Sequence, residues 1–184
     1  MRIIAGTHRG RSLAAVGKGD AGAHLRPTSD RVRESLFSML THRDVIAGAK
    51  VLDLFAGTGA LGLEALSRGA AEAVFVENGR VGQKLIQDNI AALSLRDRTK
   101  LLRNDATRLG AWPMHPFDLI FLDPPYGKGL GATALDVAAA GGWLAPGATI
   151  VWEEAKAQTA PQGFILEDSR RYGDTHITLL TWQP

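Results

Sequence analysis

Cysteine is absent from this chain of 184 residues. Its absence excludes disulfide bonds, zinc sites built on cysteine and a thiol nucleophile, and it fits a reducing compartment. Long hydrophobic runs are also absent, and none approaches the length that spans a membrane. The first residues, Met1 to Gly6, soon give way to polar and basic ones, unlike a signal peptide. We therefore expect a soluble, cytoplasmic protein.

The net charge is only +2, but the positive charges are concentrated near the amino terminus. Residues 1–43 carry eight basic and three acidic side chains, whereas the rest of the chain is mildly acidic. A basic arm of this kind favours a polyanionic partner, above all nucleic acid, although a solvated surface explains the charge alone equally well. The five histidines are scattered, so no metal site is expected.

The length and the hydrophobic content of 45% predict one domain with a sizeable core, extended by a small amino-terminal piece. We expect a basic arm and helix over residues 1–43, which would contact the nucleic acid, and a main domain over residues 44–184. A chain of this size with one site can act as a monomer.

The amino-terminal piece divides into an arm, a loop and a helix. Residues 2–14 predict a short β-hairpin or extended arm, and a glycine-rich loop follows over residues 15–25. Thr28 or Ser29 is the expected N-cap of a helix that continues to about residue 41. Its apolar stripe leaves the nearby arginines off the packed face, where they either are solvated or hold phosphates in a cleft. These arginines are Arg26, Arg31 and Arg33.

Strand and helix patterns alternate along the rest of the chain. Strands are expected at about 50–55, 73–77, 99–103, 117–122 and 148–153, and a hairpin should pair 164–172 with 176–182. Helices are expected from the glycine run at 57–62 to about 67, and at about 80–93 and 132–140. This order predicts an α/β fold with a mostly parallel, Rossmann-like sheet, helices on both of its faces and an antiparallel strand at its edge.

The first of these strands runs directly into Gly57-Thr58-Gly59-Ala60-Leu61-Gly62, a G-x-G-x-x-G pattern between a strand and a helix. Glu77 ends the second strand, where a carboxylate can accept hydrogen bonds from both ribose hydroxyls. Asn104 and Asp105 end the third strand, where a carboxylate can accept from an adenine amino group. The carboxyl ends of these strands meet at one crevice, so the pattern fits a dinucleotide or an adenosine-type cofactor equally well.

A second motif, Asp123-Pro124-Pro125-Tyr126, follows the apolar strand at 117–122; we name it the DPPY segment. Proline stiffens the backbone and leaves carbonyl groups free to accept hydrogen bonds. An aromatic face beside a carboxylate suits a planar group that bears an NH2, although a simple turn at the strand end explains the prolines too. Asp53, inside the first strand, would repel a pyrophosphate and welcome a cationic amino-acid tail.

Taken together, the motifs resemble class I S-adenosylmethionine-dependent methyltransferases that act on exocyclic amines. The similarity lies in Asp53-Leu54-Phe55-Ala56-Gly57-Thr58-Gly59 and the DPPY segment. The amino-terminal pattern narrows the resemblance to one family. Arg9-Gly10-Arg11 and the run from Arg26 to Phe37 are similar to sequences of the RsmD family. Those enzymes methylate N2 of one guanine in bacterial 16S ribosomal RNA.

The resemblance implies a function and a set of site residues. The chain would transfer a methyl group from S-adenosyl-L-methionine to a guanine in 16S ribosomal RNA, within the small subunit or an assembly intermediate. Asp123, Pro124, Pro125 and Tyr126 would be catalytic, and no metal would be needed. The implied cofactor site comprises Asp53, Phe55, Ala56, Gly57, Thr58, Gly59, Glu77, Asn78, Asn104, Asp105 and Ala106. The implied RNA contacts are Arg9, Arg11, Arg26, Arg31 and Arg33.

Other interpretations of the same residues stay open. An adenine-N6 methyltransferase for DNA or RNA uses the same logic, because both amines present two protons. A glutamine methyltransferase fits less well, since that class resembles this one with Asn in place of Asp123. A nicotinamide-dependent oxidoreductase or an RNA-binding module with a degenerate cofactor site are further alternatives.

Overall fold

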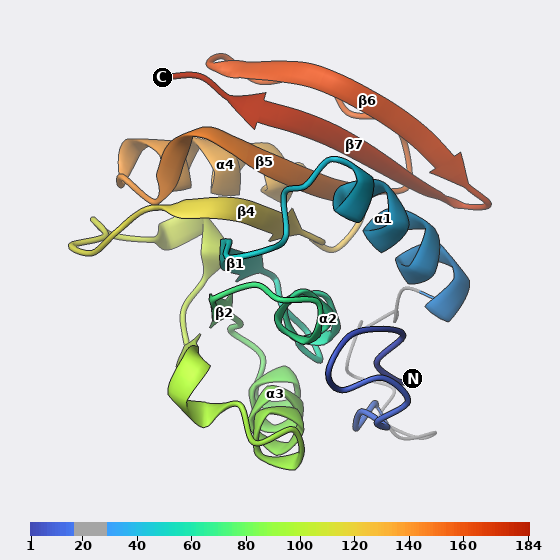
Figure 1. Ribbon diagram of the computed structural model, residues 1–184. Helices are drawn as coiled ribbons and strands as arrows, with labels where there is room; N and C mark the ends of the chain where they lie inside the picture. Colours follow the sequence, from blue (N-terminus) through green and yellow to red (C-terminus); the bar gives the residue numbers. More distant parts are fainter. Residues whose placement is uncertain (17–28) are drawn as a thin grey trace.

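A seven-stranded sheet lies at the centre of the computed structural model, in which residues 1–16 and 29–184 are described (Figure 1). Its strand order is β3-β2-β1-β4-β5-β7-β6. The five strands from β3 to β5 are parallel, whereas β7 pairs antiparallel with both β5 and β6. The bounds are β1 (Lys50–Leu54), β2 (Glu72–Val76), β3 (Thr99–Leu102), β4 (Phe117–Leu122), β5 (Leu144–Glu154), β6 (Phe164–Tyr172) and β7 (Thr175–Trp182).

The helices follow the strands as the sequence predicts. They are α1 (Asp30–His42), α2 (Ala60–Ser67), α3 (Arg80–Ala92) and α4 (Leu130–Ala140), with 3₁₀ turns η1 (Arg96–Arg98) and η2 (Ala106–Arg108). The expected α/β, Rossmann-like fold with a carboxy-terminal antiparallel hairpin is therefore confirmed. Among the described residues, no helix combines the length and the apolar character that crossing a membrane requires.

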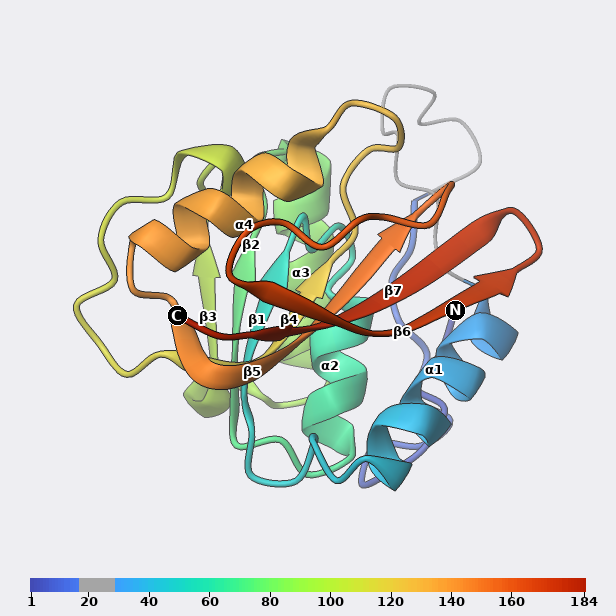
Figure 2. The same ribbon diagram turned by 90° about the horizontal axis from the view of Figure 1, so that it is seen from above.

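Two hydrophobic layers cover the two faces of the sheet. Along β1, Val51 belongs to the layer that packs against α1, α2 and α3, whereas Leu52 and Leu54 belong to the layer that packs against α4. This alternation follows from the two-residue period of a strand. Figure 2 shows α4 on one side of the sheet and α1 and α2 on the other.

The parallel strands end together at one edge of the sheet. Leu54 of β1 pairs with Val76 of β2 and with Leu122 of β4, and Leu122 pairs in turn with Trp152 of β5. The chain order reverses between β1 and β4, and ligands of open α/β sheets bind at such a reversal, outside the carboxyl ends of the strands. The register therefore sets the Gly-rich turn after β1 beside the DPPY segment after β4.

The amino-terminal arm is the expected hairpin, reduced to a single bridge between Arg2 and Ser12. It docks on α2 through Glu64, a fully buried carboxylate that accepts hydrogen bonds from the backbone N–H groups of Ile4 (2.8 Å) and Ala5 (3.1 Å). The helix after it starts as expected, with the Ser29 hydroxyl accepting from the Val32 N–H. The alternative cap Thr28 and most of the loop expected at 15–25 lie outside the described residues.

Candidate active site

The turn after β1 is strongly constrained. Phe55, Gly57 and Gly59 have φ values of 59°, 57° and 76°, in the left-handed region. Glycine adopts this conformation without strain, but Phe55 does not, and strain of this kind concentrates at ligand sites. The turn delivers the chain into α2, whose N-cap Gly59 provides no side-chain hydrogen bond. No side chain at the N-cap therefore competes with a ligand for the backbone N–H groups of Ala60 and Leu61 at this end of α2.

Gly62 allows the closest packing in the site. A Cβ atom at this position would lie 2.5 Å from the Phe75 ring and 3.1 Å from a carboxylate oxygen of Asp53. Its backbone N–H donates to Asp53 Oδ2 at 2.9 Å, so the carboxylate is held against the first turn of α2. The third glycine of the pattern is therefore explained by contact with the strand and with Asp53.

Burial governs the charge of Asp53, whose side chain is only 2% exposed. Burial raises the pKa of Asp53 to about 8, the Gly62 N–H opposes that rise, and the nearby charge of Glu77 adds to it. Without a cationic partner, this carboxyl group is mostly protonated at neutral pH.

Glu77 joins the ends of two strands. Its carboxylate accepts from the Gly57 N–H at 2.8 Å and from the Gly79 N–H at 2.7 Å, one hydrogen bond to each oxygen. A Cβ atom at Gly82 would lie 2.9 Å from the Glu77 carboxyl carbon, so a small residue is needed there as well. Each carboxylate oxygen still has a lone pair that can accept from a hydroxyl group.

The polar residues after β3 make hydrogen bonds with their neighbours in the chain, which the sequence does not indicate. Asp105 caps η2, because its Oδ1 accepts from the backbone N–H (2.8 Å) and the hydroxyl (2.7 Å) of Thr107. These hydrogen bonds lower the pKa of Asp105. Asn104 accepts from the Asp105 N–H, Asn78 after β2 is exposed, and Ala106 is buried.

The DPPY segment leaves β4 beside the turn after β1. The Asp123 N–H faces the Leu54 carbonyl at 3.4 Å, the last contact of the β1–β4 ladder. Asp123 and Tyr126 are partly buried, Pro124 is buried and Pro125 is exposed. The segment thus presents a carboxylate and an aromatic ring next to the turn that begins α2.

Three residues that the sequence analysis did not single out lie around the DPPY segment. They are Glu153, Glu154 and Thr175. The Tyr126 hydroxyl donates to Glu153 Oε1 at 3.0 Å and lies 3.3 Å from the Thr175 hydroxyl. The backbone N–H of Gly127 points at both Glu154 oxygens, at 3.2 and 3.4 Å. The rule that polar residues at strand ends face the crevice could have found the two glutamates, because they close the apolar run of β5.

Asp123 lies in an acidic environment. Burial raises its pKa well above the usual value, and the charges of Glu153, Asp53 and Glu154 raise it further, in that order. Although four carboxyl groups gather here, no group of three or more His, Asp and Glu side chains in the described part of the chain is placed to hold a metal ion. The acidic surroundings instead favour a partner that donates hydrogen bonds or carries positive charge.

The exposed position expected for Arg33 is wrong. Arg33 is fully buried, and its Nη2 donates to Asp30 (2.6 Å) and to the carbonyl of Arg2 (2.7 Å), while Nη1 lies 3.8 Å from Glu64. The physical reason is helical periodicity: Arg33 precedes the buried residues Leu36 and Phe37 by three and four positions, so it shares their face. Its guanidinium joins α1, α2 and the arm, and it is not available to a phosphate.

The other arginines with expected RNA contacts lie in two separate places. Arg9 and Arg11 are exposed at the far end of the arm, where Thr7 contacts Ser67 and Arg11 donates to the carbonyl of Ala92. That end lies at the last residues of α2 and α3, whereas Asp123 lies beside the first residues of α2. Arg31 is exposed in the first turn of α1, which approaches the β6–β7 hairpin through Ser35. Arg26 lies outside the described residues.

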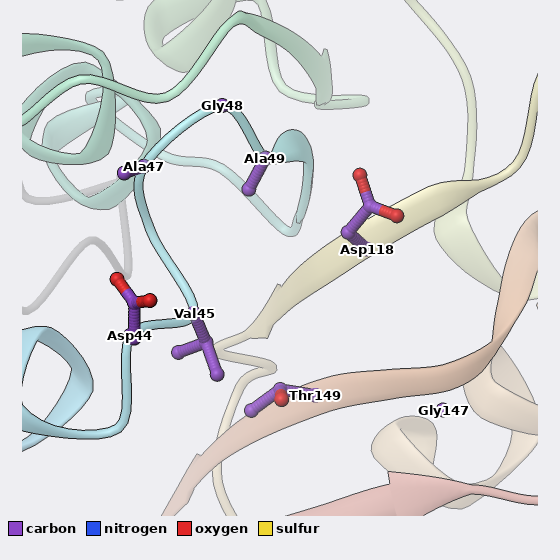
Figure 3. Close-up of a pocket in the computed structure, with 8 residues that line it drawn as sticks. All are labelled: Asp44, Val45, Ala47, Gly48, Ala49, Asp118, Gly147 and Thr149. Carbon is purple, nitrogen blue, oxygen red and sulfur yellow. The ribbon is translucent and has the colours of Figure 1, made fainter.

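A hollow of about 260 Å³ lies elsewhere, at the amino-terminal edge of the sheet (Figure 3). Asp44, Asp118 and Thr149 line it, and Asp118 already accepts a hydrogen bond from the backbone N–H of Lys50 at 2.9 Å. Since cofactors of open α/β sheets bind at the opposite edge, this hollow is not part of the candidate active site.

The strand order, the glycine turn after β1 and the DPPY segment after β4 define a Rossmann-like methyltransferase. The family model described as Conserved hypothetical protein 95 matches residues 1–181, so the chain belongs to that family, the RsmD family. Ribosomal RNA small subunit methyltransferase D of Escherichia coli K12 is 43% identical over 183 residues, covering 97% of this chain and 88% of the relative.

Two further comparisons agree with this assignment. The Haemophilus influenzae protein of the same name is 35% identical over 159 residues, covering 85% of this chain and 79% of the relative. Among solved structures, the yhhF protein of Escherichia coli has a TM-score of 0.83 at 36% identity and covers 100% of this chain and 98% of its own. The similarity therefore extends over the amino-terminal arm as well as the sheet.

Proposed function

We propose that this protein transfers a methyl group from S-adenosyl-L-methionine to the N2 amine of a guanine in 16S ribosomal RNA of the small subunit. The observation that carries the proposal is the placement of the DPPY segment next to the glycine turn, through the pairing of β4 with β1. The names of the relatives, which specify the small-subunit RNA, support the class of acceptor. The guanine-N2 specificity rests on the family resemblance.

The ends of the parallel strands would hold the cofactor. Asp53 would pair with its ammonium group, Glu77 would accept from the ribose hydroxyls, and Asp105 and its neighbours would border the adenine. The backbone of the glycine turn approaches the methionine part closely. When bound, the cofactor supplies an electrophilic methyl group on a sulfonium centre.

Asp123, Pro124 and Tyr126 would act on the acceptor base. The Asp123 carboxylate and the Pro124 carbonyl accept hydrogen bonds from the two N2 protons, which directs the nitrogen lone pair toward the methyl group. Tyr126 stacks on the base and fixes its angle. The methylated N2 would be acidic, and Asp123 would accept its proton and release it to water. Positioning supplies most of the acceleration.

The RNA would approach over the carboxyl edge of the sheet, with its target base flipped or in a loop. Arg31 remains a candidate for a phosphate contact at this edge. Two exposed lysines, Lys128 and Lys156, follow the ends of β4 and β5 and are better placed for such contacts than Arg9 and Arg11. The arm would then contact RNA far from the target base.

Methyl transfer from labelled S-adenosylmethionine tests the proposal. The acceptors are small ribosomal subunits that lack their native methylation, duplex DNA and a protein extract, and the labelled product is identified by digestion and mass. N2-methylguanosine at one site in the small-subunit RNA is the expected product. Labelled N6-methyladenine would support methyl transfer to an exocyclic amine but show that the acceptor is adenine. Labelled glutamine would show that the substrate is a protein and not a nucleic acid.

Cofactor binding should depend on pH through Asp53. The raised pKa of about 8 means that Asp53 must lose a proton to pair with the cofactor's ammonium group. Affinity for S-adenosylhomocysteine should therefore rise between pH 6 and 7, approaching tenfold per pH unit, with release of about one proton. Isothermal titration calorimetry in two buffers of different ionisation enthalpy measures both quantities.

Asp53→Asn is the matched control, because its amide oxygen can still accept from the Gly62 N–H. This variant should bind more weakly and lose the pH slope over the same range. An unchanged slope in Asp53→Asn would assign the titration to another group and remove the proposed role of Asp53.

A further inference from the structure

The Tyr126 ring is tethered at its far end. Its hydroxyl donates to Glu153 of β5 at 3.0 Å and contacts the Thr175 hydroxyl of β7 at 3.3 Å. Rotation of a tyrosine ring about its axis is otherwise only loosely restricted by intrinsic torsional preference. Because the hydroxyl oxygen lies on this rotation axis, anchoring it on two strands of the sheet fixes the direction of the ring axis and the location of the ring.

The backbone after the ring is tethered too. Gly127, with a φ of 73°, directs its N–H at the Glu154 carboxylate, which also accepts from the Ala155 N–H at 2.9 Å. Glu153 and Glu154 are adjacent in β5, so their side chains leave opposite faces of the strand. The end of β5 thus holds the DPPY segment through the Tyr126 side chain and through the backbone of Gly127, the next residue.

This arrangement of carboxylates costs electrostatic free energy. Glu153 is 4% exposed and Glu154 is 6% exposed, and the charges of both, together with that of Asp53 on β1, raise the pKa of Asp123 after β4. Buried carboxylates that repel one another destabilise a fold, and neutral glutamines could accept the same hydrogen bonds. Glu153 accepts from the Tyr126 hydroxyl and Glu154 from the N–H of Gly127, the residue after the DPPY segment, which points to a task at this segment.

We propose that Glu153 is a positioning residue for methyl transfer, holding the Tyr126 ring at the place where the acceptor base must stack. This inference rests on the proposed function, because it assigns Tyr126 the task of stacking on the base. Glu154 supports the same segment through the backbone. Glu153 acts through Tyr126, so it needs no contact with the RNA or the cofactor.

The test compares Glu153→Met, which keeps the length of the side chain but cannot accept a strong hydrogen bond, with Glu153→Gln, which can. Glu153→Met should lower kcat on small subunits by about 10- to 100-fold, the effect of a misaligned reactant, with S-adenosylhomocysteine affinity nearly unchanged. Glu153→Gln should restore most of the activity. Glu167→Gln, the same exchange on an exposed residue of β6, is the matched control and should resemble the wild type.

Two readouts separate positioning from general damage. In a Tyr126→Phe background, Glu153→Met should lower kcat little further, because the hydroxyl through which Glu153 acts is already absent. Glu153→Gln should shift the acidic limb of the kcat/KM profile to lower pH, since it removes a charge that repels the ionised Asp123. Full additivity of the two losses, or wild-type kcat in Glu153→Met, would overturn the proposal.

A measurement without RNA separates this inference from the proposed function. The chain has only 2 tyrosines, so ring-labelled protein gives two sets of NMR signals, and Tyr126→Phe assigns them. The Tyr126 signals should move or average in Glu153→Met, but stay in place in Glu167→Gln. Unchanged signals would reject the tether, whereas moved signals in an enzyme that methylates no small-subunit RNA would reject the proposed function alone.

Discussion

Asp123→Ala should lower kcat by about 100- to 10,000-fold, the range typical of a lost group that accepts a proton in the transition state. The carboxylate stands at the end of β4 beside the glycine turn, where the proposed chemistry needs an acceptor for the N2 protons. Its remaining contacts are modest, with a backbone hydrogen bond of 3.4 Å that alanine can keep. Cofactor affinity should therefore be nearly unchanged. Single-turnover methyl transfer and calorimetry measure the two quantities separately.

Asp123→Asn refines the same prediction. The amide oxygen still accepts one hydrogen bond, so this variant should retain more activity than Asp123→Ala. With the cofactor saturating, so that Asp53 does not contribute, the acidic limb of the wild-type kcat/KM profile for RNA should lie above the usual range of an aspartate. Burial and three neighbouring carboxyl groups raise the pKa of Asp123, and the Asn variant should lose that limb.

Stability offers an independent check on the same site. A folded-state pKa above the unfolded value favours folding most at low pH, and this advantage is lost as pH rises through the folded pKa. Replacing Asp123 with Asn should therefore raise the Tm at pH 8 more than at pH 5. Asp118→Asn, on the exposed amino-terminal end of the same strand, is the control. Equal losses of kcat and cofactor affinity in Asp123→Ala would show that the residue is structural.

The sequence predicts the location of the active site well because its signals are local. A buried apolar strand, such as Phe117–Leu122, ends where a polar motif begins, and all parallel strands end at the same edge. The bounds of β4 and β6 match the expectation. The start of β5 does not: the strand begins at Leu144 because a shifted register between Phe117 and Leu119 accommodates Pro146 and Gly147, which are typical of a loop.

Contacts between distant segments are what the sequence does not predict. The tether of Tyr126 requires β5 and β7 to lie side by side, with Glu153 and Thr175 brought to the same hydroxyl. The docking of the arm requires Glu64, which lies within the apolar sequence of α2 and was not singled out. Each pairing joins residues whose separation along the chain carries no periodic signal, so only the fold identifies them.

Arg33 and Arg31 should respond to substitution in opposite ways, although the sequence places them in one class. Arg33→Ala removes a fully buried side chain and its hydrogen bonds to Asp30 and to the Arg2 carbonyl, and should lower the free energy of unfolding by about 2 to 5 kcal/mol, the range for truncating a large buried side chain. For a chain of this length, that corresponds to a fall in Tm on the order of 10 °C. Thermal and urea unfolding measure it.

Arg31→Ala should leave stability within about 0.5 kcal/mol, as is usual for an exposed residue away from packed contacts. If Arg31 holds a phosphate, its loss should weaken binding of small-subunit RNA and reduce the slope of log affinity against log salt by about 1. Binding titrations at several salt concentrations measure this slope. The salt slope of Arg33→Ala should stay that of the wild type at temperatures where the variant is folded.

The pair decides between two descriptions of α1. Suppose that Arg33→Ala were as stable as the wild type and that its slope of log affinity against log salt fell by about 1. Arg33 would then be an exposed phosphate ligand, and the burial of its guanidinium would be wrong. If Arg31→Ala bound RNA with an unchanged slope, α1 would support the arm without touching the phosphates. The expected combination, one unstable variant and one with altered salt dependence, would assign Arg33 to the docking of the arm and Arg31 to the RNA, although only two positions separate them.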